Sequence, residues 1–406
     1  MSSLQQTRPL QQMTSEEGVS DTSSDLIDAH VVILNNYLRR HHVVAYKEIA
    51  RRVRKLTVLL SVDMEPDRQW EAQWDGLDVI VQKSKMFTAK WRHSSGFSED
   101  NFIHFPVDTR KQLKALTPDV ILSYEMGMRT LLCSFYRMFR RDCRLVMVGN
   151  MSEHIEKERG IFRKLLRRAI LRGVDFFSYN GPSCKRYLKS LGVKEEKLFH
   201  FPYCIDPEAV SSAPKTFDAR SVRTLLYCGA MSSRKGILQF AKTGRAWCEK
   251  NADDNVRLNI AGAGELRDEI AELSSEKFTI NFLGNCNQAE LRQAYQDADV
   301  CVFPTLADEW GLVPIEGMAS GLPVLGSIHA QSVEACVVEG ENGWVFNPDS
   351  DQEMEAAFER CMKTSPEKLA VMSIAAKDAV VHVSPAFSAN EACRMISMIA
   401  SNTSGK

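Results

Sequence analysis

One stretch, residues 299–326, constrains the fold of this chain more than any other. It begins with an apolar run at 300–303 that predicts a buried strand. A polar loop with Asp308 and Glu309 follows, Gly311 opens a predicted helix, and the sequence GLPVLG starts another strand. Strand, helix and strand in this order predict part of an open α/β sheet, which binds ligands beyond the C-terminal ends of its strands.

The start of this predicted helix has the chemistry of an anion site. The free N–H groups of Gly311, Leu312 and Val313 can face a phosphate or sugar oxygen, and the helix dipole favours negative charge there. Glu316 lies further along the helix, where its carboxylate can accept hydrogen bonds from the two neighbouring hydroxyls of a ribose. The alternative is an ordinary αβ unit with a solvated acidic loop, since short motifs also arise by chance.

The same stretch resembles the donor-site motif of retaining glycosyltransferases of the GT-B architecture, in the large family called GT4. That motif is written E-x7-E and is followed by A-x-G-x-P. Here it reads Asp308-x7-Glu316, followed by the sequence ASGLP at 319–323. The first acid is therefore Asp, unless Glu309 takes its place. The resemblance implies that Asp308 and Glu316 serve a sugar transfer that retains the anomeric configuration.

The resemblance also implies the fold class and the domain organisation. We expect an α/β protein of two Rossmann-like domains facing across a cleft, with a C-terminal helix that crosses back to the N-terminal domain. A length of 406 residues suits two such domains. The expected parts are a disordered tail at 1–28, an acceptor-binding domain at 29–205, a donor-binding domain at 206–384 and the crossover helix at 385–406.

Composition narrows the class of protein. With 44% hydrophobic and 25% charged residues, the sequence is typical of a soluble globular protein. No apolar run approaches the roughly 18 residues of a membrane-spanning helix, and the N-terminus has no signal-peptide pattern. Eleven cysteines without a CxxC pair favour reduced thiols over a disulfide framework or a zinc site. We therefore expect a cytoplasmic protein.

The net charge of −1 hides an asymmetry between the two halves of the chain. Residues 31–200 hold 32 Lys and Arg against 19 Asp and Glu, a balance of +13. Residues 201–406 hold 18 against 28, a balance of −10. A basic first half and an acidic second half predict two domains with different partners.

Apolar runs predict where the strands and helices of the first half lie. Two predicted strands enclose a basic predicted helix, which makes a right-handed parallel crossover, and three further strands follow with helical stretches between them. These strands are predicted at 30–35, 57–62, 77–81, 119–124 and 144–148, and the helix at 45–55.

The loop after the first predicted strand, residues 36–42, lies at the edge of the sheet where ligands bind. Related enzymes often carry a glycine-rich acceptor loop at this place. This chain has Arg39, Arg40, His41 and His42 instead, and we take the first three as candidate acceptor-binding residues. The alternative is a solvated basic turn.

A second candidate lies after the strand at 144–148. Members of the family often have a His or Asp there, whereas Asn150 stands near that position in this chain. Glu153 and His154 come slightly later, and His154 is a candidate for contact with the reacting sugar. A lone His is also commonly a surface residue or one whose hydrogen bonds are satisfied within the protein.

Residues 159–172 form the most distinctive stretch of the first half. Read as a helix, Ile161, Leu165, Leu166, Ala169 and Ile170 form an apolar stripe, flanked by Arg159, Arg163, Lys164, Arg167, Arg168 and Arg172. Such a helix can lie on an anionic membrane surface. It can equally pack on its own sheet with a solvated basic face.

The second half offers a diphosphate cradle. A strand at 224–228 runs into a glycine turn and the pair Arg234 and Lys235 before a predicted helix, a good arrangement for binding phosphates. The family pattern has an Arg after the first glycine, and Arg234 can compensate for Ala230 at that place. Comparable turns follow the strands within 256–266 and 278–286. The candidate donor-binding residues of these turns are Gly229, Gly236, Gly262, Gly264, Gly284 and Asn285.

These features predict the reaction. The sequence has no P-loop, HExxH or GxSxG motif, and we identify no D-x-D acid pair of the sort that holds Mg²⁺ in glycosyltransferases of the other common fold, so we expect no metal and no cofactor beyond a nucleotide-diphosphate sugar. Lys235, Arg234 and the helix start at Gly311 would meet the charge of the leaving diphosphate. We expect a glycan or lipid-linked acceptor, and no nucleic acid partner. The alternatives are a nucleotide-binding scaffold without turnover and a nucleotide-sugar epimerase or phosphorylase of the same architecture.

Overall fold

The computed structural model describes residues 26–66, 74, 76–93, 95–156, 160–211, 213–217, 222–251 and 255–401. They form two compact units. The first domain comprises the described residues of Asp21–Asp206 and Val383–Lys406, and the second domain is Pro207–His382. The predicted tail lies outside the described residues up to position 25. Its prediction is wrong for Ile27 and Asp28, which belong to the first strand.

The first domain is built on a parallel sheet of seven strands in the order β3-β2-β1-β6-β7-β8-β9. Its strands are β1 (Ile27–Asn35), β2 (Val53–Leu60), β3 (Asp78–Val81), β6 (Val120–Tyr124), β7 (Arg144–Gly149), β8 (Phe176–Tyr179) and β9 (Leu198–His200). Its helices are α1 (Arg40–Ala50), α2 (Thr109–Leu116), α3 (Met128–Phe139), α4 (Glu153–Glu156), α5 (Ile161–Leu171), α6 (Pro182–Ser190) and α14 (Pro385–Ser401). Strand β1 pairs with β2 on one side and β6 on the other, so the strand order reverses at β1. Such a switch point is where open α/β sheets bind ligands.

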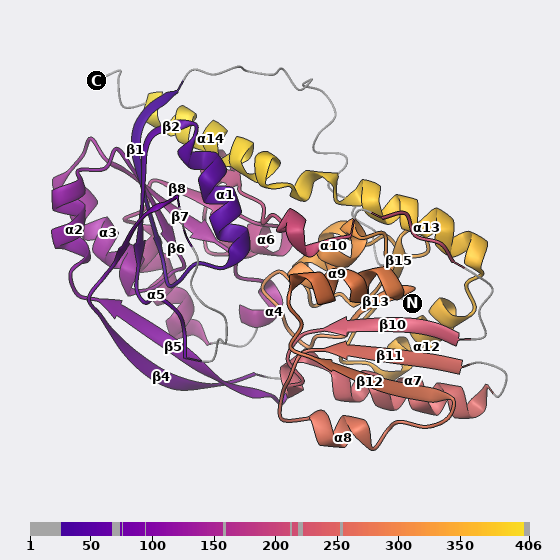
Figure 1. Ribbon diagram of the computed structural model, residues 1–406. Coiled ribbons are helices and arrows are strands. Elements are labelled where there is room, and N and C mark those ends of the chain that lie inside the picture. The colour runs from indigo at the N-terminus through magenta and orange to yellow at the C-terminus, as the bar shows by residue number, and fades with distance from the viewer. Residues whose placement is uncertain are drawn as a thin grey trace. The chain divides into compact units, whose positions relative to one another are not determined.

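The C-terminal helix α14 packs on the first domain, as predicted (Figure 1). It contacts α1 and β1, and buries Ala389, Ala392 and Ile396 in the same apolar cluster as the sheet. Ser388 Oγ also donates a hydrogen bond of 2.7 Å to the carbonyl oxygen of Pro202. Burial of this helix face therefore ties the end of the chain to the first domain.

The segment between β3 and α2 differs from the prediction. It was expected to be helical, but it forms an antiparallel hairpin of β4 (Ser84–Arg92) and β5 (Ser98–Pro106). Most residues of β4 are exposed, so neither face of this strand has to be apolar. The alternation that reveals a half-buried strand is therefore missing from its sequence.

Helix α1 also starts earlier than predicted, at Arg40, and ends at Ala50, so Lys55 belongs to β2. The buried face of the helix begins at His42, which is buried together with Tyr46 and Ile49. These three residues have the spacing of one helix face, i, i+4 and i+7. The basic loop expected at 36–42 is therefore partly the first turn of a helix.

Helix α5 presents an apolar surface outward. Ile161, Leu165 and Leu166 are exposed, and Phe162 is 86% exposed. Arg167 is buried instead, where its guanidinium forms an ion pair and hydrogen bonds with Glu156 and a hydrogen bond with Tyr187. Of the two readings left open for the predicted stripe, packing on its own sheet is therefore wrong for most of the stripe and right for Ile170, which is buried. Arg159 lies outside the described residues.

The second domain has a parallel sheet of six strands in the order β12-β11-β10-β13-β14-β15. Its strands are β10 (Val222–Cys228), β11 (Asn255–Ala261), β12 (Phe278–Gly284), β13 (Val300–Phe303), β14 (Val324–Ser327) and β15 (Gly343–Phe346). Its helices are α7 (Ile237–Lys250), α8 (Arg267–Ala271), α9 (Gln288–Asp297), α10 (Leu312–Ala319), α11 (Gln331–Cys336), α12 (Asp351–Met362) and α13 (Pro366–Ala379). The order reverses between β10 and β13, which again makes a switch point.

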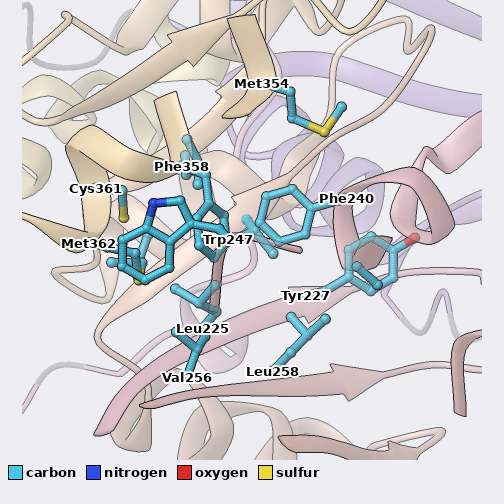
Figure 2. Packing of buried hydrophobic residues seen from close by; sticks show 14 of the residues in the cluster. Leu225, Tyr227, Phe240, Trp247, Val256, Leu258, Met354, Phe358, Cys361 and Met362 are labelled. Atoms are coloured by element: carbon cyan, nitrogen blue, oxygen red, sulfur yellow. The ribbon is translucent and has the colours of Figure 1, made fainter. Parts of the chain in front are cut away.

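An aromatic cluster between α7, α12 and the sheet holds this domain together (Figure 2). The ring centroids of Phe240 and Trp247 lie 5.7 and 5.5 Å from that of Phe358. Phe240 and Phe358 are fully buried, so truncating either to Ala should cost roughly 3–5 kcal/mol. This core holds in place the strands whose C-terminal ends carry the loops of the candidate active site. In neither domain do the described residues include a helix with the length and apolar character needed to cross a bilayer.

Candidate active site

Three loops meet at the C-terminal edge of the second-domain sheet. The Gly229 N–H, after β10, donates to the Ala261 carbonyl oxygen at 2.8 Å, and the Gly262 N–H donates to the Gly284 carbonyl oxygen at 2.7 Å. Gly262 has φ +142°, and a Cβ there would lie 2.1 Å from the Gly229 oxygen. Only glycine permits this close approach of two backbones. Gly264 extends the same loop against Met231, whereas Asn285 is exposed at the end of β12.

Gly236 places the basic pair against the loop that follows β13. Its φ is +68°, and a Cβ there would lie 2.1 Å from the carbonyl oxygen of Pro304. The carbonyl oxygen of Arg234 accepts hydrogen bonds from Leu306 N–H at 2.8 Å and from Thr305 Oγ1 at 3.2 Å. The short 3₁₀ turn Ser233–Lys235 is therefore fixed by hydrogen bonds to the main-chain oxygen of Arg234 at the switch point.

An ion pair joins these two loops. Lys235 Nζ lies 2.5 Å from Oδ2 of Asp308, and Arg234 Nη1 lies 3.6 Å from the same oxygen. Arg234 Nη1 also donates to the Ala307 carbonyl oxygen at 3.1 Å. The three side chains are largely buried, with 15–22% of each exposed. One carboxylate thus positions two cations at the edge of the sheet.

The cations keep Asp308 ionised. Burial by itself would raise the pKa of this carboxyl, but the charges of Lys235 and Arg234 outweigh it and lower the pKa to about 2. Hydrogen bonds from Lys235 and from the Trp310 N–H, which lies 3.3 Å from Oδ1, act in the same direction. At neutral pH the cluster carries two positive charges and one negative charge, a surplus suited to an anion.

Helix α10 begins beside this cluster. Gly311 precedes the helix with φ +86°, and no side chain within the described part of the chain caps it. The first-turn residues Leu312 and Val313 are half-buried. Because the first N–H groups of a helix lack intrahelical acceptors, this end adds hydrogen-bond donors and a positive dipole end to the cluster.

The other two acids of the motif have different environments. Glu316, on α10, is half-buried, and Tyr295 OH donates to its Oε2 at 3.1 Å. Glu309 is exposed, and its backbone oxygen accepts from Gln331 Nε2. Of the two candidates for the first acid, Asp308 contacts the cations, while the Glu309 side chain lies at the surface. Tyr295 is a partner of Glu316 that the sequence did not predict.

His329, after β14, is another residue that sequence reasoning missed. It is buried, and its Nδ1 lies 2.9 Å from the Leu306 carbonyl oxygen. Its own carbonyl oxygen accepts from the Asp308 N–H at 3.3 Å. Its position in the sequence could have identified it. His329 directly follows a strand that neighbours β13, so it lies at the same edge of the sheet. His329 supports the loop that carries Asp308.

The candidate residues of the first domain do not all come together. Arg40 is exposed, and Arg39 Nε donates to Tyr37 OH at 2.9 Å. His41 is buried and lines a cavity. His154 lies half-buried in α4 outside that cavity lining, and its backbone oxygen lies 2.9 Å from His93 Nε2.

Residues 222–364, which contain the ion-pair cluster and α10, match the family model "Glycosyl transferases group 1". An uncharacterized glycosyltransferase, MJ1607, of Methanocaldococcus jannaschii is 32% identical over 133 residues, which cover 32% of this chain and 33% of the relative. D-inositol 3-phosphate glycosyltransferase of Corynebacterium urealyticum is 25% identical over 167 residues, 39% of each chain. The chain thus spans about a third of the length of the curated relatives it matches.

Solved structures match over both domains. Anabaena Alr3699/HepE, solved in complex with UDP, has a TM-score of 0.68 at 15% identity, covering 92% of this chain and all of that one (100%). WaaG, a glycosyltransferase involved in lipopolysaccharide biosynthesis, has a TM-score of 0.62 at 16% identity, covering 90% of this chain and 99% of that one. These similarities confirm the predicted GT-B fold of two Rossmann-like domains and the resemblance on which that prediction depended.

Proposed function

Residues 222–364 match the group 1 glycosyltransferases within a chain of GT-B fold, and on this basis we propose that the protein is a glycosyltransferase. It moves a sugar from a nucleotide-diphosphate donor to an acceptor hydroxyl. The second domain binds the donor and the first domain binds the acceptor. The anomeric configuration is retained, because the acceptor hydroxyl attacks the face from which the diphosphate leaves.

The observation that carries this proposal is the cluster of Arg234, Lys235 and Asp308 beside the start of α10. A nucleoside diphosphate is an anion that gains charge on its terminal phosphate when the sugar–oxygen bond breaks. Lys235 offers a point charge and Arg234 a planar fork of donors, and both are already held in place by Asp308 and by main-chain contacts. Charges positioned before the reaction stabilise the transition state without reorganisation at that moment.

Glu316 provides the contact to the nucleoside. The Tyr295 hydroxyl orients its carboxylate, which can accept hydrogen bonds from the hydroxyl groups of a ribose. Gly262 and Gly264 let backbone lie close to the nucleotide, since no Cβ intervenes. HepE has been solved with UDP and with UDP-glucose, which makes these the first donors to test.

Steady-state kinetics of Lys235→Ala and Glu316→Gln test the proposal. Each change should lower activity at least tenfold, the loss expected when a contact of about 1.4 kcal/mol is removed from the transition state. Lys242→Ala and Glu269→Gln change exposed residues of the same domain and should keep wild-type rates. Wild-type rates in both site variants would contradict the proposal. Nucleotide binding without any product would instead indicate a scaffold.

We also propose that the first domain works at a membrane surface, where a lipid-linked or glycan acceptor is presented on the cytoplasmic side. The outward face of α5 supports this, because Phe162 and Leu166 are exposed beside Lys164, Arg168 and Arg172. A basic helix with an exposed apolar stripe fits an anionic bilayer, where each cation near the surface contributes about 1 kcal/mol.

Helix α3, which contacts α5, also has exposed apolar residues. Its Phe135, Met138 and Phe139 are exposed, and the guanidinium of Arg110 lies 5.2 Å from the Phe135 ring centroid. Adjacent exposed apolar residues with cations among them are unusual on a protein that meets only water. The membrane is therefore the occupant that best matches both helices.

A further inference from the structure

Helix α9 carries a tyrosine that contacts the acid of α10. Tyr295 is fully buried, and its hydroxyl donates a hydrogen bond of 3.1 Å to Oε2 of Glu316. Tyr295 lies outside the motif at 308–316, on the helix that precedes β13. Glu316 itself is only half-buried. The acid proposed to bind the ribose is therefore bonded to a side chain in the interior of the second domain.

The tyrosine is an uncharged donor. Burial raises the pKa of Tyr295 well above its usual value, and the nearby Cys228 and Glu316 act in the same direction. The phenol therefore stays protonated at neutral pH and donates to the carboxylate without neutralising it. A carboxylate has about four acceptor positions, so one bond from Tyr295 and two from a ribose can exist together.

Close packing holds the tyrosine ring against α10. Gly317 follows Glu316 in this helix, and a Cβ there would lie 2.8 Å from Cβ of Cys301 and 3.8 Å from Cε1 of Tyr295. Because Gly317 has no Cβ, α10 can lie this close to β13. The ring and the carboxylate thus belong to two helices whose spacing is set by packing before any ligand binds.

Lys215 fixes the end of α9 that carries the tyrosine. Its Nζ donates to the carbonyl oxygens of Gln296 at 2.6 Å and Tyr295 at 3.3 Å, and also to that of Ala298. These carbonyl groups belong to the last turn and the C-cap of α9, where a helix supplies no N–H donors of its own. A cation there also compensates the negative end of the helix dipole. One ammonium group therefore binds the main chain of the residue whose side chain contacts Glu316.

Ser211, shortly before Lys215 in the sequence, binds both helices. Its N–H donates to Oγ of Ser320 at 3.1 Å, and its hydroxyl donates to Oε1 of Gln296 at 2.7 Å. Ser320 is the C-cap of α10, and Gln296 is next to Tyr295 on α9. Ser211 and Lys215 together hold the two helices in one arrangement.

We propose that Tyr295 and Lys215 are positioning residues that make the donor site selective for a ribonucleotide. A carboxylate that is already oriented can accept from the 2′- and 3′-hydroxyls of a ribose, whereas a freely rotating one must first lose side-chain entropy. The orientation passes from Lys215 to Tyr295 and from Tyr295 to Glu316. The inference rests on the proposed function in one respect, the assignment of the ribose to Glu316.

Ligand pairs that differ only in the ribose hydroxyls test this selectivity. UDP, ADP and GDP are each compared with the 2′,3′-dideoxy analogue by calorimetry, and the pair that binds wild type most tightly is used for the variants. The selectivity ratio is the dissociation constant of the dideoxy analogue divided by that of the nucleotide. Wild type should have a ratio of roughly 100, since the analogue loses two hydrogen bonds to a carboxylate.

Tyr295→Phe should lower this ratio about tenfold by weakening nucleotide binding, and should leave binding of the dideoxy analogue unchanged. Tyr227→Phe is the matched control. The Tyr227 hydroxyl is also buried, but it donates to the Ala230 carbonyl oxygen at 2.6 Å, in the turn assigned to the diphosphate. This variant should affect both ligands equally and keep the wild-type ratio.

Lys215→Met tests the second positioning residue. The change removes the ammonium group but keeps most of the apolar stem. It should lower the selectivity ratio about threefold or more, the size expected of a residue that acts without contacting the ligand. Lys242→Met, at an exposed position of α7, should keep the wild-type ratio. Urea unfolding identifies any loss of the folded state before binding is measured.

Equal binding of both members of the pair by wild type would overturn the proposal, and so would a wild-type ratio in Tyr295→Phe. An equal loss of selectivity in Tyr227→Phe would reveal a general effect on the domain and would likewise overturn it. A wild-type ratio in Lys215→Met would overturn the role of Lys215. A ratio lost in Glu316→Gln but kept in Tyr295→Phe would contradict this proposal and leave the ribose contact of the proposed function intact. Binding of none of the three nucleotides would contradict both.

Discussion

Lys235 Nζ lies 2.5 Å from Asp308 Oδ2, so one ion pair joins the loops that follow two neighbouring strands, β10 and β13. The residues are far apart in sequence, and the parallel sheet brings them together. In the absence of substrate, this contact holds the lysine at the edge of the sheet and offsets part of its charge. The pair therefore links the stability of the second domain to the placement of its principal cation.

Asp308→Asn should destabilise the second domain by about 2 kcal/mol at neutral pH, because two largely buried cations lose their carboxylate. The asparagine oxygen can still accept from the Trp310 N–H. Urea unfolding measures the loss. Asp268→Asn removes an exposed ion pair and should change the free energy of unfolding by less than about 0.5 kcal/mol. Equal effects of the two changes would contradict the structural role of Asp308.

The contribution of Asp308 should disappear in acid. Its pKa is lowered from 3.8 to about 2 in the folded protein, so the stabilisation is complete above about pH 4 and is lost as the pH falls through 2. The difference in unfolding free energy between wild type and Asp308→Asn should fall from about 2 kcal/mol at pH 6 to about half of that at pH 3. A difference that does not change with pH would show that the carboxyl titrates normally.

Gly262→Ala should disrupt the donor loops, while Gly284→Ala should be tolerated. Both glycines have positive φ, but a Cβ at 262 would meet the Gly229 oxygen at 2.1 Å and a Cβ at 284 would meet nothing within 4 Å. We expect Gly284→Ala to cost about 1–2 kcal/mol for its backbone conformation alone. Gly262→Ala should lower the melting temperature further and weaken UDP binding at least tenfold. Equal melting temperatures would contradict the close approach of the loops.

Replacing Phe162 and Leu166 with Glu should release the protein from anionic membranes. The change removes exposed apolar area from α5 and adds negative charge beside its cations. Flotation with phosphatidylglycerol vesicles at low salt should show at least a tenfold drop in the partition coefficient, and binding by wild type should weaken as salt is added. Val371→Glu, an exposed apolar position of α13, is the matched control. Failure of wild type to float at low salt would contradict the membrane proposal.

The fold was largely predictable because buried parallel strands leave continuous apolar runs. The strands predicted at 144–148 and 300–303 occur where these runs predict them, as β7 and β13. The hairpin of β4 and β5 was missed for the opposite reason, since most of β4 is exposed and its sequence carries no burial pattern. The sequence of α5 had a similar limit. Its periodicity identified an amphipathic helix, but it did not show which face of the helix packs against the domain and which face is exposed.

The candidate site was predictable residue by residue, but its contacts were not. Motif positions singled out Lys235 and Asp308 separately, and only the sheet topology shows that they pair. His42 was treated as part of a charged turn, because its role as a buried residue of α1 depends on Tyr46 and Ile49 further along the helix. That Nε2 of His41 and Nε2 of His42 are buried without a hydrogen-bond partner among the described residues could not have been inferred from the sequence.

The central claim is that the second domain binds a nucleoside diphosphate between the turn at 229–236 and the start of α10. A crystal structure of the chain soaked with UDP tests it most directly. We predict diphosphate density within hydrogen-bonding distance of Lys235 and of the amide at Leu312, with the ribose against Glu316. Nucleotide bound elsewhere, with these residues contacting only protein and solvent, would contradict the account.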